Sequence, residues 1–230
     1  MNPRIFADAA ELGQEAAELT AKACAEAIAA RGSFHLVLAG GNTPRVCYEH
    51  LSGMPLDWSR VHIWFGDERC VPVGHEDRND RMADEVLLSH VTITPSHIHR
   101  MPAELGPEEG AARYAAELAA APVMDMMRFD MIHLGMGEDG HTASLFPGHA
   151  TLSDARLAVP VFNSPKPPPE RVSMGLSVLN TARQKLILAA GAGKREALAR
   201  IEGGEKLPVA MIEDALWLLD RAAAGAVEDS

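Results

Sequence analysis

Short apolar runs alternate with helical segments along this chain of 230 residues, and this alternation constrains the fold more than any other feature. Apolar runs of this length, bounded by glycine, proline and polar residues, are typical of buried strands. Strands that alternate with helices favour a parallel sheet. The sequence therefore predicts an α/β fold, with a doubly wound, mostly parallel sheet and helices on both faces. The predicted strands are residues 34–39, 61–65, 129–134, 158–161, 185–190 and 215–220.

The predicted helices carry recognisable start signals. Asp8 is a suitable N-cap for a helix over residues 8–30, and Thr43 with Pro44 is a suitable start for one that runs to Leu51. Asp77 or Asn79 is the expected cap of the next helix. Further helices are predicted over residues 107–121 and 178–182 and after Lys194, and the alanine-rich end beyond residue 220 is expected to fray.

Composition and charge exclude several classes of function. The formal net charge is −11, which argues against nucleic acid or an anionic membrane as a partner. An anionic substrate would need a local basic pocket that overcomes the global field. Neither an internal repeat nor a domain boundary is apparent, so a single domain over residues 1–230 is expected.

The cysteines and the N-terminal region point to the cytoplasm. Cys24, Cys47 and Cys70 are odd in number and lack a framework spacing, which favours reduced thiols over disulfides or a zinc ribbon. The first 30 residues contain no basic segment followed by an apolar one, and no run approaches the ~20 apolar residues of a membrane span. A cytoplasmic protein without membrane contact is expected.

Polar or glycine-rich clusters follow four of the apolar runs. They cover residues 40–43, 67–69, 138–141 and 191–194. In open α/β sheets, ligands bind beyond the carboxyl ends of the strands. We therefore expect these four loops to converge on one crevice.

The richest of these clusters lies within residues 135–148, which read G-M-G-E-D-G-H-T-A-S-L-F-P-G. Glu138, Asp139 and His141 on such a bend form a plausible catalytic group, because histidine titrates near neutrality. The alternative is an ordinary strand-to-helix turn in which Asp139 or Thr142 caps the next helix. His133, inside the preceding apolar run, is expected to be a core histidine.

Three other features suit the binding of an anion. Gly40 and Gly41 would leave the amides of a helix N-terminus bare, which favours phosphate, although an ordinary tight turn explains them equally well. Lys194 follows a glycine-rich strand end and could complete a phosphate pocket, or could be a solvated lysine. Asp67 and Arg69 could face the same crevice or form a surface ion pair. His97 and His99 lack further residues at ligand spacing, so no metal is expected there.

Taken together, these motifs are recognisable. The stretch over residues 135–148, with A-G-G-N-T-P-R, W-F-G-D-E-R-C-V-P and P-P-E-R-V-S-M elsewhere, closely resembles the 6-phosphogluconolactonases from about Leu36 to the terminal strand. The Ser-Asn pair usual in that family reads Arg78-Asn79 here, which puts the role of Arg78 in doubt. Related glucosamine-6-phosphate deaminases carry a glutamate where this chain has Phe146, and the loss of that carboxylate argues against their chemistry.

The resemblance implies a Rossmann-like fold of the deaminase/isomerase type and hydrolysis of 6-phospho-D-glucono-1,5-lactone, without a cofactor or metal, by a monomer or weak homodimer. It implies that His141 is the general base, oriented by Glu138 or Asp139, and that Asp67 contacts sugar hydroxyls or assists the base. Ser144 is disfavoured as a nucleophile and is expected in the first turn of a helix. The implied phosphate-binding residues are Gly40, Gly41, Asn42, Thr43, Arg69, Arg171 and Lys194. The alternatives are a sugar-phosphate deaminase or isomerase, and a non-catalytic sugar-phosphate-binding protein.

Overall fold

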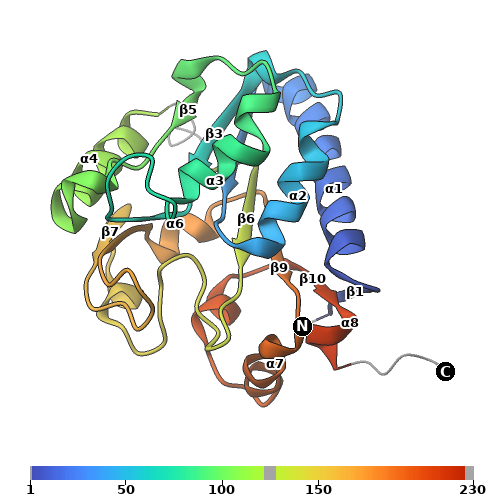
Figure 1. The fold of residues 1–230 in the computed structure, drawn as a ribbon, viewed down its shortest axis with the longest axis vertical. Helices are drawn as coiled ribbons and strands as arrows, with labels where there is room; N and C mark the ends of the chain where they lie inside the picture. The colour runs from blue at the N-terminus through green and yellow to red at the C-terminus, as the bar shows by residue number, and fades with distance from the viewer. Residues whose placement is uncertain (1, 122–127, 226–230) are drawn as a thin grey trace.

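The computed structural model describes residues 2–121 and 128–225, and a seven-stranded sheet runs through the middle of the molecule (Figure 1). The strand order is β1-β10-β9-β6-β2-β3-β5, and every neighbouring pair is parallel. The predicted doubly wound, mostly parallel sheet is therefore confirmed. Its strands are β1 (Arg4–Phe6), β2 (Phe34–Leu38), β3 (Val61–Phe65), β5 (Ile98–His99), β6 (Met131–Gly135), β9 (Gln184–Ala189) and β10 (Leu216–Asp220).

Helices cover both faces of this sheet, which explains why its central strands are apolar throughout. His133 in β6 points to one face, where it contacts Thr20 of α1 and stacks on Tyr48 of α2. Trp64 in β3 points to the other face, towards Tyr114 of α4. Figure 1 places α1 and α2 side by side on one side of the molecule and α4 on the other. The helices are α1 (Ala9–Arg31), α2 (Asn42–Ser52), α3 (Asn79–Val86), α4 (Pro107–Ala120), α6 (Leu176–Asn180), α7 (Arg195–Glu202) and α8 (Arg221–Ala224).

A second, smaller sheet was not predicted. Its antiparallel strands are β4 (Asp67–Arg69), β8 (Arg171–Met174) and β7 (Ala158–Val161), in the order β4-β8-β7. Gly66 joins β3 directly to β4, and its carbonyl accepts a hydrogen bond from the Met174 N–H. The chain thus passes from the main sheet to the small one within a single residue, which places two predicted site segments on adjacent strands.

Helix starts were predicted less well than helix positions. Asp8 caps α1 as expected, because its carboxylate accepts from the N–H groups of Ala10 and Glu11. Thr43 does not cap α2, which begins one residue earlier with Gly41 at the cap position. Neither Asp77 nor Asn79 caps α3. The prediction of a frayed end beyond residue 220 was wrong for residues 221–224, which form α8 with Asp220 as the cap; residues 226–230 lie outside the described part.

The prediction that His133 belongs to the core is confirmed. His133 is fully buried, and this burial lowers its pKa to about 3, so it is a neutral core histidine. The three cysteines are free thiols, two of them buried. Among the described residues, no helix combines the length and apolarity that would be required to cross a membrane.

Histidine rings form a stacked column at the amino ends of β2 and β3, away from the glycine-rich loops. The ring centroids of His35 and His62 lie 4.4 Å apart, and those of His62 and His97 lie 3.9 Å apart. His99 stacks on Trp64 at 3.7 Å. Within the described ranges, no group of three or more histidine, cysteine or acidic side chains could hold a metal ion.

This column predicts a loss of stability in mild acid. Burial, together with the charges of neighbouring histidines, lowers the pKa of His35 to about 3 and that of His62 to about 4. Since the unfolded chain takes up these protons near pH 6.5 and the folded protein does not, the free energy of unfolding should decrease as the pH falls from about 6.5 towards 4. Chemical denaturation at several pH values measures this slope.

A matched pair of variants assigns the slope to the column. His62→Gln should reduce the pH dependence and leave the part that His35 and the buried His133 cause, whereas His50→Gln, on the exposed surface of α2, should leave it unchanged. Equal slopes for the wild type and the His62 variant would show that other groups cause the effect.

Candidate active site

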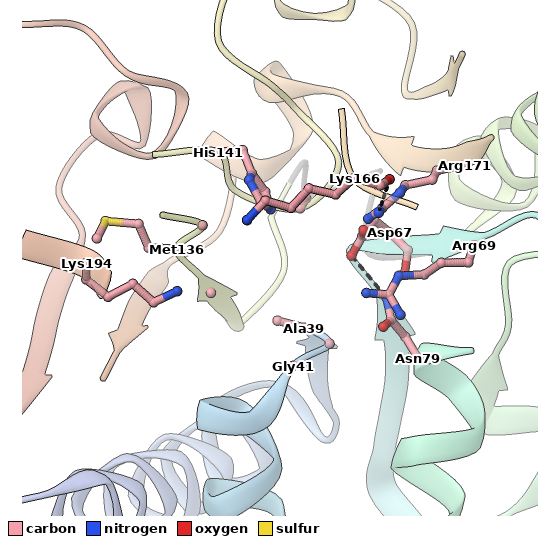
Figure 2. A pocket seen from close by; sticks show the side chains of 14 residues that line it. Ala39, Gly41, Asp67, Arg69, Asn79, Met136, His141, Lys166, Arg171 and Lys194 are labelled. Atoms are coloured by element: carbon pink, nitrogen blue, oxygen red, sulfur yellow. Dashed lines mark hydrogen bonds between the residues drawn. The ribbon is translucent and has the colours of Figure 1, made fainter. Parts of the chain in front are cut away.

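A pocket of about 220 Å³ opens at the carboxyl ends of β2 and β6. The strand order reverses between these two neighbours, because β3 lies on the outer side of β2 and β9 on the outer side of β6. Such a switch point is the usual ligand-binding position in open α/β sheets. Figure 2 shows the pocket, whose lining residues are Ala39, Gly40, Gly41, Asp67, Arg69, Asn79, Gly135, Met136, Gly137, His141, Ala143, Lys166, Arg171 and Lys194.

All four predicted loops contribute to this lining, as does the segment that carries Arg171. Of the predicted site residues, the lining includes Gly40, Gly41, Asp67, Arg69, His141, Arg171 and Lys194. It does not include Asn42, Thr43, Glu138 or Asp139. Asn79 and Lys166 were not predicted as site residues. Asn79 was expected only as a possible helix cap, and a lysine among prolines carries no local signal.

His141 is held by its own loop. Its Nδ1 lies 2.5 Å from Asp139 Oδ1, and the same oxygen accepts from the His141 backbone N–H at 3.1 Å. With Nδ1–H donating to the carboxylate, Nε2 is left free to accept a proton. Gly137 is required here, because a Cβ at this position would lie 2.0 Å from His141 Nδ1. The loop therefore fixes both the position of the imidazole and its tautomer.

Asp139 rather than Glu138 contacts the imidazole. Burial works to raise the pKa of Asp139, but hydrogen bonds from His141 and the charges of His141 and Lys166 together lower it to about 2. Glu138 is exposed and directed elsewhere, since a Cβ added to Gly193 would lie 2.8 Å from its Oε1. The sequence left open whether Glu138 or Asp139 contacts the imidazole, and the geometry favours Asp139.

No helix follows this loop, so the expected first turn around Ser144 was wrong. Residues 135–148 remain a loop, in which Thr142 and Leu145 form an isolated bridge and Ala143 has a φ of 48°. Asp139 and Thr142 therefore cap nothing. Ser144 is fully buried, and its Oγ donates to Asp67 Oδ2 at 2.6 Å. Its hydroxyl is thus inaccessible to a substrate and tied to a carboxylate of another strand.

Asp67 is fixed from two sides. Besides the bond from Ser144, its Oδ1 accepts from Asn79 Nδ2 at 3.2 Å, and its backbone carbonyl accepts from the same nitrogen at 2.8 Å. Asn79 in turn lies against Gly40, where an added Cβ would approach its Oδ1 to 1.9 Å. Gly40 therefore serves close packing, and the carboxylate of Asp67 is held in the pocket wall as an acceptor with a defined orientation.

The neighbouring Arg78, where the resembling family has serine, lies outside the pocket. It is buried and pairs with Asp80 through two hydrogen bonds of 2.8 and 2.9 Å. Glu68 replaces a side-chain cap on α3, since its carboxylate accepts from the N–H groups of Asn79 and Asp80. Burial raises the pKa of Glu68 to about 7, although these hydrogen bonds oppose the shift. The departure at residue 78 thus changes the support of the site and not its lining.

Four cationic side chains line the pocket: Arg69, Lys166, Arg171 and Lys194. Among the described residues, none of them forms an ion pair with a carboxylate. Burial lowers the pKa of both Arg171 and Lys194. Cations that are partly desolvated and unpaired, in a protein with a net charge of −11, favour an anionic ligand.

Two further features favour an anion. Arg69 has a buried Nε that meets no acceptor in the described part of the chain, while one of its terminal nitrogens donates to the Asp77 carbonyl. The N-terminus of α2 reaches the pocket at Gly41 without a side-chain cap, so its amides and the positive end of its dipole face the ligand space. Both features provide donors for phosphate-type oxygens.

Phe146 packs beside His141 and Arg171. It is buried, and its ring centroid lies 4.6 Å from that of His141 and 5.6 Å from the Arg171 guanidinium carbon. An aromatic ring therefore occupies the space next to the imidazole.

Comparisons with known proteins agree with this geometry. Residues 7–218 match the family model described as glucosamine-6-phosphate isomerases/6-phosphogluconolactonase. The chain is 38% identical to a 6-phosphogluconolactonase of Mycobacterium leprae over 97% of both chains, and 41% identical to one of Streptomyces coelicolor over 86% of this chain and 84% of the other. The crystal structure of a Thermotoga maritima 6-phosphogluconolactonase superposes with a TM-score of 0.85 at 29% identity, covering 94% of this chain and 98% of that one.

Proposed function

Because the chain belongs to the family of glucosamine-6-phosphate isomerases and 6-phosphogluconolactonases, we propose that its pocket hydrolyses 6-phospho-D-glucono-1,5-lactone to 6-phospho-D-gluconate, a step of the oxidative pentose phosphate pathway. The observation that carries this proposal is the proximity of a base and unpaired cations. His141, with Asp139 behind it, shares one pocket with four cationic side chains. A phosphorylated sugar ester needs both: a base for water at the ester and positive charge for the phosphate.

The hydrolysis requires little machinery, because a lactone is an activated ester. His141 Nε2 takes a proton from water as the water oxygen adds to the lactone carbonyl. The carbonyl electron pair moves to its oxygen, and the resulting oxyanion requires a donor or a positive charge. When the intermediate collapses, the ring C–O bond breaks and the imidazolium returns the proton to the departing alkoxide, and the new carboxylic acid then loses its proton to solvent. Asp139 stabilises the imidazolium between these two steps.

The remaining lining residues bind the substrate. Arg69, Arg171 and Lys194, with the amides at the start of α2, hold the phosphate, and Asp67 accepts from sugar hydroxyls. The arginines donate N–H groups to the phosphate oxygens, and the lysine provides a point charge. Asn42 and Thr43 do not line the pocket, so no contact with the phosphate is assigned to their side chains.

Deamination or isomerisation is the less suitable activity. Phe146 leaves no carboxylate in contact with the imidazole other than Asp139, which is already hydrogen-bonded to it, among the described residues. A non-catalytic sugar-phosphate sensor would not need the His141–Asp139 pair. Deamination thus lacks a second carboxylate at the imidazole in the described part of the chain, and a sensor leaves the His141–Asp139 pair unexplained.

A coupled assay tests the proposed activity. The protein should accelerate the appearance of 6-phosphogluconate, followed through 6-phosphogluconate dehydrogenase, beyond the spontaneous hydrolysis measured without it. Equal rates with and without the protein would remove the proposed function.

The phosphate assignment predicts a difference between two substrates. Lys194→Ala should raise KM for the phosphorylated lactone by roughly 10- to 100-fold, which is the loss of one hydrogen bond to a charged group. The same variant should have little effect on plain gluconolactone, which has no phosphate. Steady-state kinetics with both lactones provide the comparison, and equal changes for the two would place Lys194 away from the phosphate.

A further inference from the structure

Lys166 reaches the pocket from a proline-rich segment, residues 164–169, and it is the lining cation that the proposed phosphate site does not use. Its side chain lines the pocket, and Figure 2 shows it extending towards His141. Its ammonium group has no hydrogen-bond or ion-pair partner within the described ranges. An unpaired cation beside the base is costly unless a ligand supplies the negative charge.

The backbone that carries Lys166 is held firmly. Arg171 Nη2 donates to the carbonyls of Lys166 and Pro167 at 2.9 and 3.1 Å, and its Nε donates to that of Pro168 at 3.1 Å. Ser164 Oγ donates to the Lys166 carbonyl at 2.8 Å and accepts from the Lys166 N–H at 3.3 Å. Three N–H groups of Arg171 thus donate to this segment, and the Lys166 side chain extends into the pocket from backbone that is held in place.

The side chain of Lys166 extends towards His141 (Figure 2), and its charge acts on ionisable groups of two pocket loops. Burial is the largest influence on the pKa of Asp139 and raises it, whereas the hydrogen bonds from His141 and, to a smaller extent, the charge of Lys166 lower this pKa. Burial lowers the pKa of Lys194, and the charge of Lys166 lowers it further against the effect of Glu138. Since Asp139 is bonded to His141, these effects agree with the direction of the side chain in Figure 2.

We propose that Lys166 binds the ester end of the substrate and stabilises the oxyanion at the lactone carbonyl. This inference rests on the proposed function. As water adds, the ammonium group donates a hydrogen bond to the carbonyl oxygen that gains the electron pair, and it keeps its proton throughout. Arg171 is then also a positioning residue, because it fixes the segment from which the lysine extends. After ring opening, the same ammonium group faces the carboxylate of the product.

This assignment separates two ligands that share a phosphate. 6-Phosphogluconate has a carboxylate at the end that Lys166 is proposed to contact, whereas glucitol 6-phosphate has a hydroxyl there and the same phosphate. Removing a charged donor from a carboxylate costs roughly 10- to 100-fold in affinity. Lys166→Met should therefore lower the affinity for 6-phosphogluconate by that factor and leave the affinity for glucitol 6-phosphate nearly unchanged. Calorimetric titration with both ligands measures the two affinities.

Matched variants sharpen the result. Lys194→Met should weaken the binding of both ligands by a similar factor. Lys22→Met, on the exposed surface of α1, should weaken the binding of neither ligand. Lys166→Arg should retain most of the affinity for 6-phosphogluconate. An equal loss for both ligands in the Lys166 variant, with the melting temperature unchanged, would make Lys166 a phosphate ligand and overturn the proposal. The absence of any loss would overturn it as well.

Kinetics provide an independent test. Lys166→Met should lower kcat on the phosphorylated and on the plain lactone by a similar factor, roughly 10²-fold for one oxyanion donor. An effect confined to KM for the phosphorylated lactone would contradict the assignment. Failure of the proposed function is recognised separately, because it concerns the rate of the wild-type protein over the spontaneous reaction, whereas this inference concerns the binding of two non-reacting ligands.

Discussion

Replacing His141 with alanine should lower kcat for the phosphorylated lactone by roughly 10²- to 10⁴-fold, the range expected for a general base. Its Nε2 is the free nitrogen of the ring, since Nδ1 is engaged by Asp139. No other imidazole lines the pocket within the described residues. Stopped-flow or coupled kinetics, corrected for spontaneous hydrolysis, measure the loss.

The control for this variant is ligand binding. The affinity for 6-phosphogluconate should change only slightly, because the cations that hold its phosphate and carboxylate are untouched. His50→Ala, on the surface of α2, should retain full activity. A turnover close to that of the wild type in the His141 variant would exclude the histidine from the mechanism.

Asp139→Asn should lower kcat by roughly 10²- to 10⁴-fold, because an asparagine amide can turn its N–H groups towards Nδ1. Nδ1 would then accept, and the ring proton would move to Nε2, the atom that must take the proton of water. KM should change little, since Asp139 does not line the pocket. Steady-state kinetics across the neutral pH range measure both constants.

Glu138→Gln is the matched control, because it removes the neighbouring carboxylate without touching the imidazole. We expect its kcat to remain close to that of the wild type, with at most a moderate change in KM, because Glu138 lies beside Gly193 and contributes to the field at Lys194. If the glutamate variant instead lost activity and the aspartate variant did not, the hydrogen bond at Nδ1 would have no part in catalysis.

Predictions that rested on local sequence signals were the most successful. The strands β2, β3, β6 and β9 follow from apolar runs that are buried on both faces, and α1 follows from its periodicity and the Asp8 cap. The rule that ligands bind beyond the carboxyl ends of parallel strands predicted a common crevice, and the lining of the pocket includes residues of all four expected loops. Each of these inferences depends on neighbours in the chain or on a general property of parallel sheets.

Predictions that depended on distant contacts failed or remained open. Ser144 was expected in a helix, but its hydroxyl meets Asp67, which is 77 positions away, and this contact belongs to a loop. α3 lacks the local cap that was expected because Glu68, 11 positions before Asn79, supplies the acceptor. Lys166 gave no signal at all, because its place in the pocket depends on the hydrogen bonds of Arg171 to the proline segment.

The sequence by itself therefore determined the central strands of the main sheet, the longer helices between them and the chemical groups available at the strand ends, because periodicity, glycine placement and residue type act over a few neighbouring residues. Only the tertiary structure decided which acid meets His141, that Asp67 is clamped from two segments, and that a small antiparallel sheet brings Arg171 beside Arg69. The physical reason is that the direction of a side chain is set by packing and hydrogen bonds from segments far away in the chain.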